Sequence, residues 1–74
     1  MITVVNPETN RRARGRTIRS ACQNLARDHM GTPRYPRSEL AVWAAYPGNR
    51  TTFDVYRAVG VKVCRALVIG TEGA

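Results

Sequence analysis

A short segment near the start of the chain, residues 11–19, has five arginines in nine positions: Arg11, Arg12, Arg14, Arg16 and Arg19. An arginine side chain donates two parallel hydrogen bonds to a phosphate or carboxylate, and its charge persists at every physiological pH. Several such side chains close together can neutralise several phosphates and release their counterions, which gives affinity independent of base sequence. The segment predicts a site for a polyanion, although a run of charge is also typical of an ordinary solvated loop.

The positive charge is concentrated in the N-terminal half of the 74-residue chain, whose formal net charge is +7. Residues 1–37 have eight arginines and two acidic residues, whereas residues 38–74 have four basic and three acidic residues. This asymmetry favours nucleic acid or an acidic protein surface as partner, ahead of a membrane. A GC-rich genome would also raise the arginine content, together with Ala, Gly and Val, without any such partner.

Residues suited to catalysis or metal binding are sparse. The single histidine, His29, and the two cysteines, Cys22 and Cys64, lack the close pairs of ligands that hold zinc. On a helix, Cys22 and His29 would lie about 10 Å apart along the axis, too far for direct proton transfer. Both cysteines fall in apolar patterns, which predicts buried thiols. We expect no enzyme, no cofactor and no metal site.

Residues 18–30 have the clearest periodic pattern in the sequence. Apolar residues recur at the spacing of one helical face, with Thr17 as the predicted N-cap, Gly31 as the C-cap and Pro33 beyond it. The opposite stripe is predicted to face solvent and consists of Arg19, Gln23 and Arg27.

Both ends of the chain predict strands, over residues 1–5 and 61–69, because they are rich in β-branched residues. On the second strand, one side is predicted to consist of Val61, Val63, Leu67 and Ile69. Residues 11–16 fit either another strand, with Arg12, Arg14 and Arg16 on one face, or a mobile loop. Residues 70–74 are predicted to be a frayed tail.

The region between residues 38 and 60 is ambiguous. Ser38 as a cap and several alanines favour a helix that ends at Pro47, although the apolar residues also fit a strand that enters a turn. Residues 51–60 fit a short helix or a strand with Phe53, Val55 and Val59 on one face. Two helices here would resemble a helix-turn-helix, but charged residues would fall at its inward positions, so two small core elements or a hairpin are favoured.

The aromatic side chains have two interpretations. Exposed beside the arginines, they could stack on single-stranded bases. In a chain this short they more often form the core, so Trp43, Tyr46, Phe53 and Tyr56 are interpreted as core residues. Tyr35, which lies between two prolines, is interpreted as a surface residue.

Together these patterns predict a single domain, residues 1–74, of the α+β class, with one central amphipathic helix packed on a small sheet that includes the N- and C-terminal strands. The sequence has neither a signal-peptide pattern nor an apolar run long enough to span a membrane. A cytoplasmic location and no membrane partner are therefore expected.

Two resemblances bear on function. The segment RRARGRTIR resembles the arginine-rich motifs of viral RNA-binding peptides. In its length and its Arg and Ala content, the chain looks like the small accessory proteins encoded by phages of GC-rich actinobacteria, which implies an intracellular role directed at the host or the genome.

Two functions follow from these patterns. The first is a small basic protein that binds DNA or RNA, in which the phosphate contacts come from Arg11, Arg12, Arg14, Arg16, Arg19 and Arg27. The second is a protein-interaction module, such as a modulator of a host protein or a small homo-oligomeric structural component. In that function an exposed strand edge or Trp43 would be buried against the partner.

Overall fold

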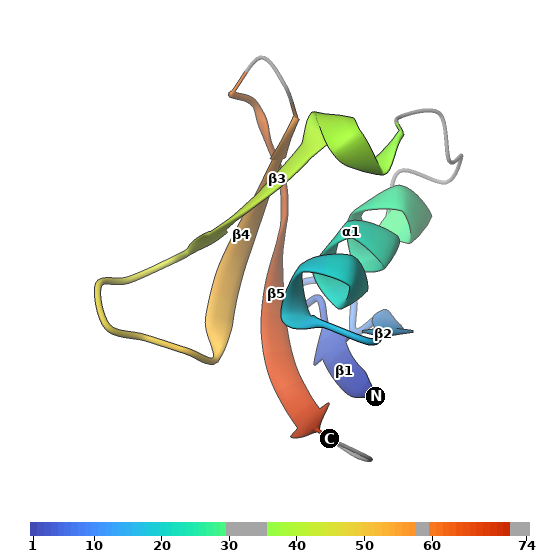
Figure 1. The fold of residues 1–74 in the computed structure, drawn as a ribbon, viewed down its shortest axis with the longest axis vertical. Coiled ribbons are helices and arrows are strands. Elements are labelled where there is room, and N and C mark those ends of the chain that lie inside the picture. Colours follow the sequence, from blue (N-terminus) through green and yellow to red (C-terminus); the bar gives the residue numbers. More distant parts are fainter. Residues whose placement is uncertain (30–35, 58–59, 72–74) are drawn as a thin grey trace.

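The computed structural model describes residues 1–29, 36–57 and 60–71. Five strands form one antiparallel sheet in the order β2-β1-β5-β4-β3, and the helix α1 packs on one side of it (Figure 1). The predicted α+β architecture, with both terminal strands in the sheet, is confirmed. In chain order the elements are β1 (Ile2–Val5), β2 (Arg12–Gly15), α1 (Ile18–His29), the 3-10 helix η1 (Arg37–Glu39), β3 (Leu40–Ala44), β4 (Thr52–Arg57) and β5 (Lys62–Thr71).

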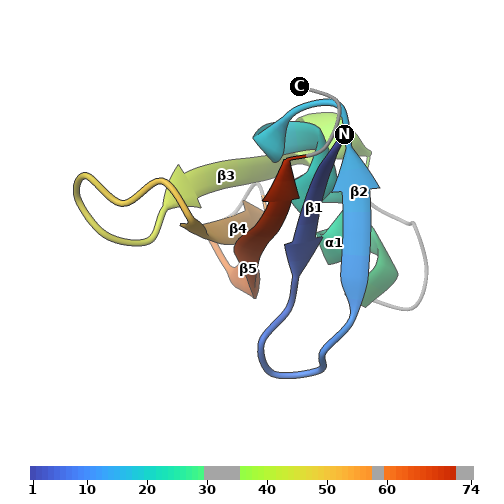
Figure 2. The same ribbon diagram turned by 90° about the horizontal axis from the view of Figure 1, so that it is seen from below.

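The arginine segment forms a strand rather than a loop. Strands β1 and β2 lie side by side as a hairpin (Figure 2). The turn is closed by the Asn6 N–H, which donates to the Arg11 carbonyl oxygen at 2.8 Å, and by the Glu8 N–H, which donates to Asn6 Oδ1 at 2.9 Å. Asn10 adopts a φ of 61°, a left-handed conformation that asparagine tolerates better than most residues. The strand ends at Gly15, so the predicted ribbon is correct for Arg12 and Arg14 but does not extend to Arg16.

Helix α1 begins as the sequence predicts. The Ser20 N–H donates to Thr17 Oγ1 at 3.0 Å, and the Thr17 N–H donates to Ser20 Oγ at 3.0 Å. This reciprocal pair satisfies backbone donors that the first turn of a helix leaves without partners. The residues predicted at the other end of the helix, Met30, Gly31 and Pro33, lie outside the described residues.

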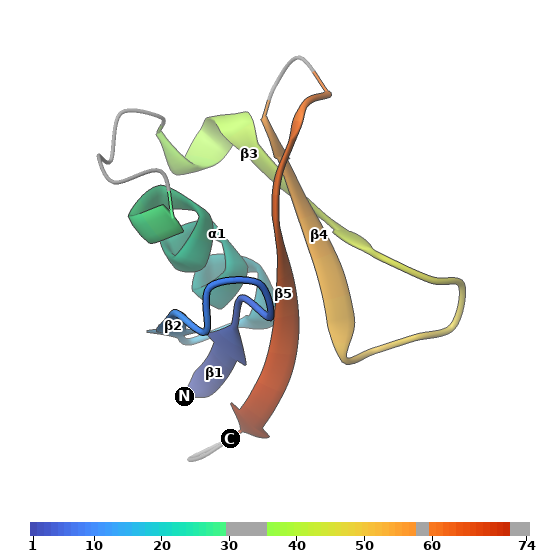
Figure 3. The same ribbon diagram turned by 180° about the vertical axis from the view of Figure 1, so that it is seen from behind.

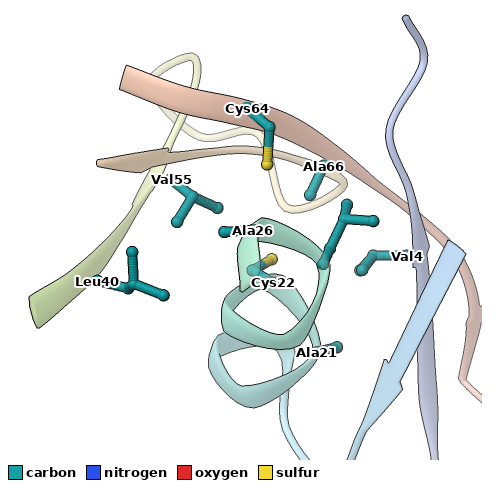
Figure 4. Packing of buried hydrophobic residues seen from close by; sticks show 9 residues of the cluster. Val4, Ala21, Cys22, Ala26, Leu40, Val55, Cys64 and Ala66 are labelled. Carbon is teal, nitrogen blue, oxygen red and sulfur yellow. The ribbon is translucent and has the colours of Figure 1, made fainter. Parts of the chain in front are cut away.

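The core lies between α1 and the sheet (Figure 4). The helix contributes mainly small side chains, so its backbone can lie close to the strands beneath it. Buried apolar side chains from four strands complete the core. Its members are Val4, Ala21, Cys22, Leu25, Ala26, Leu40, Val55, Cys64 and Ala66.

The helix predicted over residues 38–48 is wrong. The cap-like signal at Ser38 belongs to η1, and the chain then continues as the edge strand β3, paired with β4. Period-two alternation decides the outcome, because Leu40 is buried in the core and Val42 packs against it, whereas Trp43 points to the other face. Residues 40–57 therefore form a β-hairpin, and not the two helices that a helix-turn-helix motif requires.

Strand β4 settles the second ambiguity. It places Val55 in the core and Phe53 against it, as the strand interpretation predicts, while Val59 lies outside the described residues.

The prediction that Val61, Val63, Leu67 and Ile69 share one side of the last strand is also wrong, because Val63 packs against the core whereas Leu67 pairs with Val5 and Thr52 on the other face. Cys64 and Ala66 are buried and Val68 packs against the core, whereas Val61 and Ile69 are about half exposed. Two bulges change the alternation that the sequence suggests. At each of them β5 has one extra residue, namely Val63 opposite β4 and Ile69 opposite β1.

The prediction that residues 70–74 form a frayed tail is wrong for the first two of them. Gly70 pairs with Thr3 and Thr71 pairs with Ile2, so these two residues belong to the sheet. Residues 72–74 lie outside the described residues.

Candidate nucleic-acid interface

The sheet has one open face among the described residues. Both α1 and η1 lie on the same side of β3, β4 and β5, and the view from behind shows the opposite side of these strands without a helix (Figure 3). Because side chains alternate along a strand, the residues next to the core positions project from this open face. They include three aromatic or apolar residues and five charged ones, namely Leu67, Trp43, Tyr56, Arg12, Arg14, Asp54, Lys62 and Arg65.

Arg12 and Arg14 form the basic part of the open face. Both are exposed on the edge strand β2, and with three neighbours from β1 and β5 they line a shallow hollow of about 490 Å³. The Asn24 side-chain amide of α1 donates to the Arg14 carbonyl oxygen at 2.8 Å, which ties the strand to the helix. The two guanidinium groups are thus carried on one face of a fixed backbone. Arg11 and Arg16 are exposed at the two ends of the strand.

The structure does not bring Arg19 and Arg27 into this group. Arg19 lines a different hollow, between α1 and β3, together with Val42 and Trp43. Arg27 is partly buried, and its Nε atom has no hydrogen-bond partner among the described residues. Since β2 and β3 are opposite edges of the sheet, the six arginines of the predicted footprint are divided between two places.

The prediction that the stripe of Arg19, Gln23 and Arg27 faces solvent is wrong for its middle residue. Gln23 is only 6% exposed, and its Nε2 donates to the Leu40 carbonyl oxygen at 3.1 Å. The stripe faces β3, a segment for which local propensity predicts a helix. Gln23 therefore joins α1 to the sheet edge.

A charged cluster on the open face was not predicted. The Asp54 carboxylate is nearly buried, and its Oδ1 lies 3.0 Å from Arg65 Nε and 3.2 Å from Lys62 Nζ. Burial raises the pKa of Asp54, but the hydrogen bonds and charges of Arg65 and Lys62 outweigh it and hold that pKa below its usual value. The sequence signal for this cluster is the negative charge of Asp54 on β4 and the positive charge of Lys62 and Arg65 on β5. This signal identifies a contact once the register between the two strands is known.

The same cluster extends to an aromatic side chain. Arg65 Nη1 donates to the Tyr46 hydroxyl at 3.1 Å, and the guanidinium carbon lies 5.4 Å from the centroid of the Tyr46 ring. The cluster as a whole retains one positive charge, because Asp54 compensates one of its two cations. Arg65 is thereby held against both a carboxylate and a ring.

The interpretation of the aromatic residues as core is confirmed for Phe53, which packs against the core, and is wrong for Trp43, Tyr46 and Tyr56, of which Tyr56 projects from the open face. Trp43 is 64% exposed and Tyr46 is 50% exposed, whereas Phe53 and Tyr56 are partly buried. The physical reason for Trp43 and Tyr56 is alternation along β3 and β4, because Val42 and Val55 occupy the positions that face the core. Tyr35 lies outside the described residues.

The two cysteines are free and buried, as predicted. Burial raises the pKa of Cys22 to about 12 and that of Cys64 to about 11, so both thiols stay protonated and weakly nucleophilic at neutral pH. Figure 4 shows both sulfur atoms within the core cluster. Within the described ranges, no three His, Cys, Asp or Glu side chains are grouped so that they could hold a metal ion.

Comparison with known proteins found no matching family model, no matching curated protein and no matching solved structure. Among the described residues, no helix has the length and apolar character needed to cross a bilayer.

Proposed function

We propose that the protein binds nucleic acid through the phosphate backbone, with Arg12 and Arg14 at the centre of the contact. The observation that carries the proposal is that both arginines are exposed on one face of an edge strand, and neither forms an ion pair with a described carboxylate. Arg11 and Arg16 continue the positive charge beyond each end of the strand. Two buried free thiols fit a reducing compartment, and we place the protein in the cytoplasm.

The size of the expected salt effect follows from the number of arginines. Four arginines that each neutralise one phosphate give a slope of log K against log salt of about −3. Affinity would then fall about 60-fold between 50 and 200 mM salt. Arg19 and Arg27 lie elsewhere and would add to the footprint only if the nucleic acid wraps around the molecule.

Fluorescence anisotropy of labelled single-stranded DNA, duplex DNA and structured RNA tests the proposal over this range of salt. The variant Arg12→Ala/Arg14→Ala should lower the magnitude of the slope by about 1.5. The matched control Arg19→Ala/Arg50→Ala removes the same charge from other exposed positions and should change the slope less. Equal effects of the two double variants would contradict a localised site, and a flat salt response of the unchanged protein would contradict the function itself.

A second candidate function, protein interaction, is favoured by the edge strand β3. Its sequence, LAVWA, has no charged residue, whereas the opposite edge strand β2 has two arginines. Natural sheets usually protect their edges with charge, so an uncharged edge is suited to pairing with another strand. A hollow of about 410 Å³ between this edge and α1 is lined by Ile18, Arg19, Ala41, Val42, Trp43 and Phe53.

The backbone pattern indicates which groups of β3 are available. The Ala45 N–H donates to the Thr52 carbonyl oxygen at 2.9 Å, and bonded pairs alternate in an antiparallel ladder. The backbone groups of Val42 and Ala44 therefore point away from β4. Light scattering without nucleic acid should find a stable oligomer if a second copy uses this edge, and Ala44→Pro should dissociate it, since it removes an outward N–H. A monomer at all concentrations would exclude self-pairing.

A further inference from the structure

Trp43 is the most exposed of the large hydrophobic side chains among the described residues, with 64% of its surface accessible. It lies on β3 directly opposite Asp54 of β4, on the face of the sheet away from α1. Its neighbours along this face include the Lys62 and Arg65 cations that contact Asp54. An indole held on a strand beside positive charge is suited to stacking on a flat aromatic ligand that is attached to an anion.

A hollow next to Trp43 has room for such a ligand. It measures about 480 Å³ and is lined by Ala41, Trp43, Tyr56, Arg57 and Gly60. Tyr56 pairs with Ala41 on one side and with Lys62 on the other, so its ring projects from the same face as Trp43. Gly60 has a φ of 80°. No heavy atom lies within 4 Å of the position that its Cβ would occupy, so the side of the hollow at Gly60 is open.

The cations near the hollow can hold a phosphate. Lys62 is 44% exposed on its side chain although it contacts Asp54, and the cluster of Asp54, Lys62 and Arg65 retains one net positive charge. Arg12 and Arg14 project from the same face of the sheet, at its other end. A strand of nucleic acid across the open face would meet arginines at one edge and aromatic rings at the other.

We propose that the hollow beside Trp43 and Tyr56 stacks a nucleobase, so that the protein binds single-stranded nucleic acid in preference to duplex. This inference rests on the proposed function and names its ligand class. A base in a duplex is already stacked between its neighbours, whereas an unpaired base can lie on an aromatic side chain. One stacked base increases affinity by about 5- to 150-fold.

The experiment uses the intrinsic fluorescence of Trp43, the one tryptophan in the sequence. The full chain is titrated at 50 mM salt with a 15-nucleotide thymidine oligonucleotide and with an abasic oligonucleotide of equal length. The thymidine oligonucleotide should quench the fluorescence and bind at least fivefold more tightly, because only it has bases. A duplex of the same length should bind without quenching.

Two variants separate stacking from general loss of apolar surface, with anisotropy of the labelled thymidine oligonucleotide as readout. Trp43→Ala should lower its affinity at least fivefold, towards that of the abasic oligonucleotide, while Val61→Ala, which trims another exposed apolar residue, should not. Equal affinities for the thymidine and abasic oligonucleotides without quenching would overturn base stacking and leave phosphate binding intact. No binding of either oligonucleotide would overturn the proposed function and the inference together.

Discussion

Replacing Gly15 with alanine should destabilise the fold, because β2 crosses α1 at this residue. A Cβ atom at Gly15 would lie 2.5 Å from the backbone nitrogen of Ala21 and 2.9 Å from its Cα, where ordinary contacts are at least 3.4 Å. Backbone atoms cannot rotate aside as a side chain can, so the helix must move by about 1 Å. Overpacking of this kind costs about 2–3 kcal/mol. A domain of 74 residues has about 4–11 kcal/mol of total stability, so the loss is large.

Urea unfolding followed by circular dichroism measures this loss in the free energy of unfolding. In a thermal melt followed by the same signal, the melting temperature should fall by about 10–20 °C. Gly70→Ala is the matched control on β5, since its Cβ would meet nothing closer than the Thr3 Cβ at 3.8 Å. The control should leave stability unchanged or raise it slightly. Equal stability of the two variants would refute the close approach of β2 and α1, and with it the placement of Arg12 and Arg14.

Three further predictions concern single side chains. Cys22 and Cys64 should react with a thiol reagent at pH 8 only after the protein is unfolded in denaturant, because burial raises both pKa values; fast labelling of the native protein would contradict their burial. Folding holds the pKa of Asp54 below its usual 3.8, so its carboxylate stabilises the fold above about pH 4 and loses this effect as the pH falls through the folded-state pKa. Asp54→Asn should therefore lose less stability than the unchanged protein between pH 7 and pH 3 in urea unfolding, and parallel losses would be inconsistent with the ion pairs. Thr17→Ala removes the N-cap of α1 and should cost about 1 kcal/mol in the same assay, whereas no change would show that the cap contributes nothing.

Local patterns were enough to predict α1 and the terminal strands. The cap at Thr17 and the period of the apolar residues both depend on neighbours within one or two turns, and the structure agrees with both. The β3 segment depends instead on its pairing with β4, which no local pattern reveals. Its alanines and Ser38 favour a helix by propensity, and tertiary packing overrides that preference.

The candidate site was only partly predictable for the same reason. That Arg12 and Arg14 share a face follows from alternation along one strand, provided that the segment is a strand. The contact of Asp54 with Arg65 needs the register between β4 and β5, and the exposure of Trp43 needs knowledge of which residues α1 covers. The bulges at Val63 and Ile69 shift the faces of β5, and nothing in the local sequence marks them.

Mapping amide chemical shifts by NMR during addition of a single-stranded oligonucleotide tests most directly whether the open face binds nucleic acid. We expect the shifts to concentrate at Arg12 and Arg14 and to continue to Trp43 and Tyr56, while the core face of α1 around Leu25 stays unchanged. Shifts confined to the hollow between α1 and β3 around Arg19, or no shifts at low salt, would contradict binding of nucleic acid by the open face.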